Sequence, residues 1–179
     1  MMTNVILVVD TLKGFLDKDA GLLANPDARK VIPNIRDLLE RKTKEGWKVI
    51  FLADNHKEND LEFEMFPKHC VIGTEETQIV MELEEFVGED NYISKTRYSG
   101  LFRTTLEKVL QKENAEKIVV VGIYADICVL YTAADLRNRD YDVTVAKDST
   151  MTLTGIDAMI FEHMQNILGI RVVERQEEI

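Results

Sequence analysis

Short, strongly apolar runs alternate along the chain with longer amphipathic segments. The runs are rich in Val and Ile and nearly continuous, which is typical of strands buried on both faces of a parallel sheet. They cover residues 4–10, 48–54, 117–123, 142–148 and 170–173. Apolar residues at helical spacing predict helices over 31–46, 76–86, 101–115, 127–140 and 155–169. The alternation predicts an α/β fold of three layers, α/β/α, around a mostly parallel, Rossmann-like sheet.

Composition narrows the class of protein. With 179 residues, 45% of them hydrophobic, the chain is long enough for a real core, and we expect a single domain over 1–179. The net charge of −10 argues against a nucleic-acid partner. No stretch approaches the ~20 apolar residues of a membrane span. The start lacks the basic region of a secretory signal, and two cysteines make no disulfide framework, so we expect a cytoplasmic protein.

Polar residues follow the predicted strands at positions where ligands usually bind. Asp10 and Asp54 each end a strand, and the segment 122–128 follows a third. Because ligands of open parallel sheets bind beyond the carboxyl ends of the strands, these three places should converge on one rim.

Cys128 lies in that third segment, at the predicted start of a helix. There the positive end of the helix and its free N–H groups favour a thiolate nucleophile and could hold an oxyanion. The alternative is a buried cysteine that only packs. Lys95, in "ISKTRYSGLF", could stabilise the thiolate while Asp10 takes its proton, although a lysine there, taken alone, is more often a solvated surface residue.

The loop 55–70 holds a second group of polar residues. Asp54, His56 and His69, with a further Glu, would suit Zn²⁺, Mn²⁺ or Fe²⁺. The alternative is an acidic surface loop whose histidines have no shared role. Cys70, next to His69, either packs under this loop or touches the outer shell of the metal site, and we favour packing. His163 lies on a helix away from the loop and is interpreted as structural or surface.

Taken together, these motifs resemble the isochorismatase-like cysteine hydrolases, and among them the nicotinamidases. The resemblance runs from "VILVVDTLKGFL" to "VTVAKDST" and includes "KTRYSGLF" and "VVVGIYADICV" followed by "TAADL". It implies a catalytic triad of Asp10, Lys95 and Cys128. It also implies a cis peptide bond between Ile123 and Tyr124, which would turn the Tyr124 amide, with that of Cys128, toward a substrate oxyanion.

The resemblance also extends to the metal. The family's Asp-x-His and aromatic-Pro-x-His elements match Asp54–His56 and Phe66–His69. Many members supply another histidine between them, where this chain has Glu62 and Glu64. Their position implies that a glutamate completes the site; Glu62 is favoured and Glu64 stays open. A divalent metal, Zn²⁺ before Mn²⁺ or Fe²⁺, is the implied cofactor.

The activity implied is hydrolysis of nicotinamide to nicotinic acid and ammonia through a thioester, an amidase role in NAD metabolism. Phe15, Phe66 and Tyr98 would form an aromatic pocket for the ring, although each could instead be core. Alternatives are a related amidase for another small amide or ureido compound and, from a different class, a small-molecule-binding module without turnover. Isochorismate itself is less favoured, because the branch that cleaves it lacks the nucleophilic cysteine. Members of this family are often homo-oligomers, which the resemblance implies for this protein too, although no stretch of the sequence identifies a subunit interface.

Overall fold

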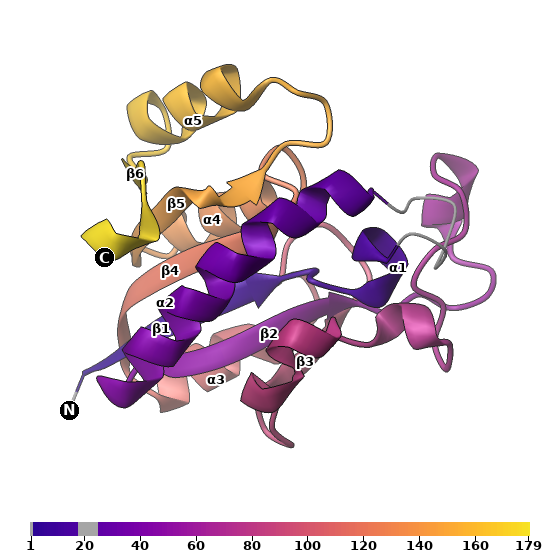
Figure 1. Ribbon diagram of the computed structural model, residues 1–179, viewed down its shortest axis with the longest axis horizontal. Helices are drawn as coiled ribbons and strands as arrows, with labels where there is room; N and C mark the ends of the chain where they lie inside the picture. The colour runs from indigo at the N-terminus through magenta and orange to yellow at the C-terminus, as the bar shows by residue number, and fades with distance from the viewer. Residues whose placement is uncertain (1, 18–24) are drawn as a thin grey trace.

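The protein is described here by a computed structural model that covers residues 2–17 and 25–179 (Figure 1). Its sheet has six parallel strands in the order β3-β2-β1-β4-β5-β6. The strands are β1 (Thr3–Val9), β2 (Lys48–Asp54), β3 (Tyr92–Lys95), β4 (Ala115–Ile123), β5 (Asp142–Met151) and β6 (Arg171–Val173). The predicted parallel sheet is therefore confirmed.

Helices cover both faces of this sheet. The α-helices are α1 (Lys13–Leu16), α2 (Ile32–Lys44), α3 (Leu106–Lys112), α4 (Cys128–Arg137) and α5 (Asp157–Asn166). Short 3₁₀ helices are η1 (Pro26–Val31), η2 (Leu61–Glu64), η3 (Glu75–Thr77), η4 (Met81–Phe86) and η5 (Gln176–Glu178). The helices α1 and α2 share one core with one face of the sheet, and α3, α4 and α5 share a second core with the other face. The expected three layers are therefore present.

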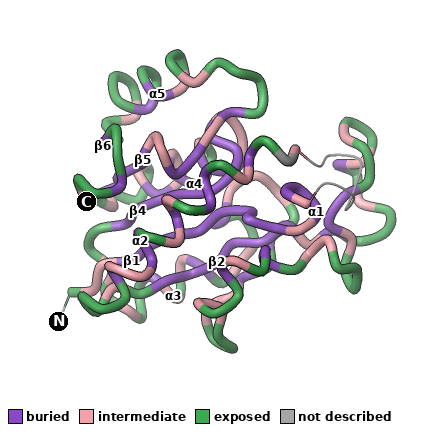
Figure 2. The backbone as a smooth tube through the Cα atoms, in the orientation of Figure 1, coloured by how far each residue is buried: buried purple, intermediate pink, exposed green. Residues whose placement is uncertain are grey.

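The core follows from the apolar runs. In β1 the side chains of Ile6 and Val8 join the core under α2, and those of Val5, Leu7 and Val9 join the core under α4, as the two-residue period of a strand requires. All five are fully buried, and Figure 2 shows the central strands buried along most of their length. A strand packed on both faces needs apolar residues at every position.

Two predicted helices are shorter or more broken than expected. The segment 76–86 forms only η3 and η4, because its backbone bonds to the chain where α1 begins: Lys13 N–H donates to Gln78 O, and Val80 N–H donates to Thr11 O. The segment 101–115 becomes helical only at Leu106, whose N–H is held by the Thr104 hydroxyl. Such side-chain bonds offer the backbone an alternative to the helix.

The strand β3 was not predicted, and it carries Lys95. It is four residues long, lies at the edge of the sheet and pairs only with β2, where Lys95 is the register partner of Asp54. Among residues 2–17 and 25–179, no helix combines the length and the apolar character needed to cross a bilayer.

Candidate active site and metal centre

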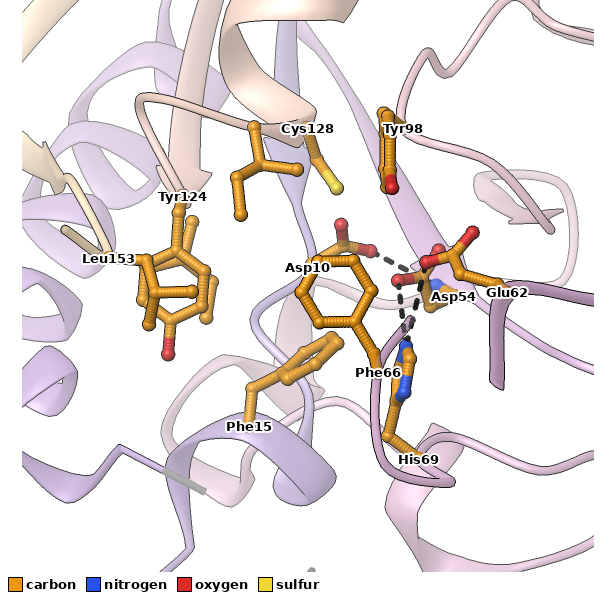
Figure 3. A pocket seen from close by; sticks show the side chains of 12 residues that line it. Asp10, Phe15, Asp54, Glu62, Phe66, His69, Tyr98, Tyr124, Cys128 and Leu153 are labelled. Atoms are coloured by element: carbon orange, nitrogen blue, oxygen red, sulfur yellow. Dashed lines mark hydrogen bonds and ion pairs between the residues drawn. The ribbon is translucent and has the colours of Figure 1, made fainter. Parts of the chain in front are cut away.

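The carboxyl ends of four adjacent strands meet at one rim, three of them as the sequence predicts and the fourth, β3, in addition. Asp10 directly follows β1, Asp54 ends β2, Lys95 ends β3, and a four-residue connection after β4 leads to Cys128. Figure 3 shows the sulfur of Cys128 directed toward the Asp10 carboxylate, with Asp54 beside it. Side chains distant in the sequence are thus brought together by the strand order alone.

Lys95 is at the centre of this arrangement. Its Nζ forms ion pairs with Asp10 Oδ2 at 2.7 Å and Asp54 Oδ1 at 2.5 Å, and it lies 3.5 Å from Cys128 Sγ. The backbone N–H of Asp54 donates to Asp10 Oδ1 at 3.0 Å. We call Asp10, Lys95 and Cys128 the strand-end cluster. Its residues are 1%, 2% and 7% exposed, so Lys95 is not a solvated surface lysine.

Burial dominates the electrostatics of this cluster. Burial and the neighbouring Asp54 carboxylate outweigh the attraction of Lys95 and raise the pKa of Asp10 to about 7. Burial alone would lower the pKa of Lys95, but Asp10 and Asp54 outweigh it and raise that pKa well above its usual value. A permanently charged lysine thus faces an aspartate that can accept a proton near neutral pH.

The surrounding protein groups do not favour the thiolate expected of Cys128. The protein groups alone do not make Cys128 a resident thiolate: burial raises the pKa of its thiol well above the ordinary value, although Lys95 acts in the opposite direction. The nearby Asp10 and Asp54 also disfavour a second negative charge. The proton of Cys128 therefore has to be removed when the reaction begins, and Asp10 is the adjacent acceptor.

Cys128 is the first residue of α4, as predicted. The peptide bond between Ile123 and Tyr124 is cis, in agreement with the family resemblance. Among the described residues, the amides of Tyr124 and Cys128 donate no hydrogen bond to the protein. Gly122, just before, has φ +111, and a Cβ there would lie 2.1 Å from Val9 O, so only glycine fits where β4 leaves the sheet.

The predicted metal ligands also gather at this rim. Ligand atoms of Asp54, His56 and His69 lie within 4.8 Å of one another, and all three side chains are buried. Glu62, on η2, reaches the same place: its Oε1 lies 3.9 Å from His69 Nε2. Glu64 is exposed, which favours Glu62 as the fourth residue. Asp54 links the metal ligands to the strand-end cluster, because its Oδ2 faces His69 while its Oδ1 pairs with Lys95.

The free polar atoms at this place fit a divalent metal. His56 Nε2 and Glu62 Oε2 are buried without a hydrogen-bond partner among the described residues. Uncompensated burial of such atoms is costly, and a metal would relieve it. His69 Nδ1 lies 2.8 Å from Pro67 O, which leaves its Nε2 lone pair for a ligand. Two imidazole nitrogens with two carboxylates are a donor set that suits Zn²⁺, Mn²⁺ or Fe²⁺.

Two further residues at the site were not predicted from the sequence. Asp60 Oδ2 lies 3.3 Å from His56 Nδ1, and Asp60 Oδ1 accepts from Arg97 Nη1 at 2.9 Å. The sequence signal was weak: an acid four residues after a histidine, in a loop already rich in acids.

A pocket of about 470 Å³, including the space at its mouth, opens onto both groups. Phe15, Phe66 and Tyr98, the residues expected to form an aromatic pocket, are among its lining residues (Figure 3). Ile123, Ile127, Leu153 and Tyr124 complete the apolar wall, and the sequence analysis had not assigned the first three to a pocket. Among residues 2–17 and 25–179, the charged lining residues are Asp10, Asp54 and Glu62, and no Lys or Arg joins them.

Cys70 and His163 lie outside the site chemistry. Cys70 is fully buried in the core that includes α1, with its sulfur 3.7 Å from Glu76 O, and burial raises the pKa of its thiol far above the ordinary value. This agrees with the packing interpretation. His163 is exposed on α5.

Comparisons with known proteins agree with this geometry. The profile of the isochorismatase domain matches residues 4–173. N-carbamoylsarcosine amidase from Thermoplasma acidophilum is 28% identical, with a TM-score of 0.87 over 99% of each chain. Nicotinamidase/pyrazinamidase PncA from Bacillus subtilis is 27% identical, with a TM-score of 0.85 over 97% of this chain and 100% of that one. A pyrazinamidase of Pyrococcus horikoshii in complex with zinc is 26% identical, with a TM-score of 0.85 over 95% and 98% of the two chains. The chain therefore belongs to the isochorismatase family of hydrolases.

Proposed function

We propose that the protein is a metal-assisted cysteine amidohydrolase that converts nicotinamide to nicotinic acid and ammonia. The observation that carries this proposal is the Lys95 ammonium group, which holds Asp10, Asp54 and Cys128 together at the base of an aromatic pocket. A buried lysine, a proton acceptor with a pKa near 7 and a thiol within reach are what nucleophilic catalysis on an amide requires.

The first half of the proposed reaction forms a thioester. Asp10 takes the proton of Cys128, and the thiolate attacks the carboxamide carbon. The amides of Tyr124 and Cys128 stabilise the oxyanion of the tetrahedral intermediate. Asp10 then returns the proton to the nitrogen, the C–N bond breaks and ammonia leaves.

The second half restores the enzyme. Asp10 takes a proton from water, and the resulting hydroxide attacks the thioester carbon. The C–S bond breaks, the acid leaves, and Cys128 regains its proton from Asp10. Lys95 stays protonated throughout and offsets the negative charge that moves between Asp10 and Cys128. A divalent metal held by Asp54, His56, Glu62 and His69 would supply a Lewis acid for the ring nitrogen, and we favour zinc.

The pocket favours a neutral aromatic amide over an anionic one. Among the described residues, three carboxylates and no lysine or arginine line the pocket. Lys95, at its base, is already paired with Asp10 and Asp54, so only the metal would offer counter-charge to a substrate that carries its own carboxylate. The runner-up is an amidase for another small amide or ureido compound, of which an N-carbamoyl amino acid is an example. Phe15 and Phe66 suit stacking on a flat ring better than binding of a flexible acid.

The test is release of ammonia from the purified protein, before and after removal of metal with a chelator. We expect turnover of nicotinamide, loss on chelation and recovery with Zn²⁺, with elemental analysis identifying the bound metal. An N-carbamoyl amino acid and an aliphatic amide serve as the matched panel. Preference for the carbamoyl acid would replace our substrate, and absence of ammonia from every amide would favour a binding module.

Two further expectations belong to this proposal. Both cysteines are free, which is consistent with a reducing cytoplasm. A homo-oligomer of single-domain subunits is our expectation for the assembly, and sedimentation of the purified protein tests it.

A further inference from the structure

We propose that Asp60 and Arg97 are positioning residues for the candidate metal ligands, with Asp60 selecting the tautomer of His56. Neither residue lines the pocket. Both contact residues that would bind the metal, without being ligands themselves. The proposal rests on the metal site of the proposed function but not on its substrate.

The carboxylate of Asp60 contacts three groups at once. Its Oδ1 accepts the backbone N–H of Glu62 at 3.0 Å and Arg97 Nη1 at 2.9 Å. Its Oδ2 lies 3.3 Å from His56 Nδ1, within hydrogen-bond distance although the ring is not fully aligned. The Asp60 side chain is only 9% exposed. One half-buried acid thus contacts two of the four candidate ligand residues.

The contact with His56 has a chemical consequence. A neutral imidazole carries its proton on one nitrogen and its lone pair on the other. A carboxylate beside Nδ1 favours the proton there, and the lone pair is then on Nε2. Nε2 is the nitrogen that faces Asp54, 3.7 Å from its Oδ2. Asp60 therefore prepares the nitrogen that faces the metal site.

Arg97 joins the metal ligands to the strand-end cluster. It lies two residues after Lys95, and its guanidinium contacts Asp60 and lies 3.9 Å from Glu62 Oε2. It thereby offsets part of the negative charge that Asp54, Asp60 and Glu62 concentrate within a few ångströms. Arg97 and Lys95 lie on one short segment. Because Arg97 contacts the loop of His56 and Glu62, and Lys95 contacts Asp10 and Cys128, this segment links the metal ligands to the strand-end cluster.

The first experiment measures zinc affinity by competition with a chelator. Asp60→Ala should weaken zinc binding by about 10–100-fold. Asp60 is also the N-cap of η2. Asp60→Ser keeps a capping oxygen but cannot also reach His56, so it should still weaken zinc binding, with an unchanged Tm of the metal-free protein. Asp60→Asn should fall in between, since its amide oxygen can still accept from Nδ1. Glu58→Ala, which removes an exposed carboxylate from the same loop, is the matched control and should bind zinc normally.

A second measurement needs no metal. Nitrogen NMR of the metal-free protein at alkaline pH should show the proton of His56 on Nδ1 in the wild type, and a shift toward Nε2 in Asp60→Ala. A wild-type His56 protonated on Nε2, or normal zinc affinity in Asp60→Ala and Asp60→Ser, overturns the proposal. Failure of nicotinamide turnover with these results intact would remove only the proposed substrate. A wild type that binds no zinc would remove the metal site and this proposal together.

Discussion

The two halves of the candidate site are built in different ways. The strand-end cluster is fixed by hydrogen-bonded strands and a helix start, and its residues are almost completely buried. The metal ligands other than Asp54 lie on the loop 55–70, which has one short 3₁₀ helix and exposes Leu61 and Met65. A rigid scaffold thus holds the groups that move protons, whereas cross-links such as that of Asp60 with Arg97 hold the ligands on the loop. A substitution confined to one half should therefore impair catalysis or metal binding, but not both.

The largest expected effect is a loss of turnover without a loss of zinc binding. Cys128→Ala removes the proposed nucleophile and should reduce turnover by roughly 10³-fold or more. Zinc affinity should stay unchanged, because Cys128 is outside the donor set of Asp54, His56, Glu62 and His69. Ammonia release and chelator competition on one preparation check both halves, and retained amidase activity would refute the nucleophile assignment.

Lys95→Met should damage both halves, since Lys95 pairs with Asp10 and with Asp54. Removing one partner from a buried ion pair leaves uncompensated charge and costs about 3–5 kcal/mol. Urea denaturation measures this loss of stability, and it should shrink at acid pH, where Asp10 is protonated. The control is Lys147→Met, which breaks an exposed pair with Glu174 and should cost about 0–1 kcal/mol. Equal costs for the two variants would contradict the central position of Lys95.

A pair of glycines compares the rim with the loop directly. Gly122→Ala places a Cβ 2.1 Å from Val9 O at φ +111, and should cost about 3 kcal/mol or more. Gly73→Ala, just past the loop, has φ +85 but nothing within 4 Å of its Cβ, and should cost about 1 kcal/mol. Thermal and urea unfolding of both variants test the ranking. A reversed order would mean that the strand ends are not the more rigid half.

The last prediction concerns how stability depends on pH. The folded protein raises the pKa of Asp10 from 3.8 to about 7, so protonated Asp10 contributes stability that is fully present below 3.8 and lost as pH rises through 7. Asp54, with a pKa lowered to about 2 because Lys95 and His56 outweigh burial, affects stability only below that window. Glu62 and His56 also titrate at this site. The difference in slope between wild type and Asp10→Asn, measured by urea denaturation in chelator, isolates Asp10; identical slopes would contradict the raised pKa.

The sequence predicts the rim better than it predicts the loop. Continuous Val and Ile runs identify the central strands, and Asp10, Asp54 and Cys128 follow from where those runs end. The strand β3 escaped prediction because four residues at a sheet edge show no such run. Asp60 and Arg97 escaped because they are 37 residues apart, and their contact exists only after β2 and β3 have paired.

The pairing of Asp54 with Lys95 also has a consequence for folding. An edge strand as short as β3 has few backbone bonds to fix its alignment, and sliding it by one residue would turn every side chain to the opposite face. Such a slip would leave the ammonium group outside and two carboxylates stranded in a dry interior. The charges proposed for catalysis therefore also favour the correct register of β3 on β2, because only in that register does Lys95 neutralise Asp10 and Asp54.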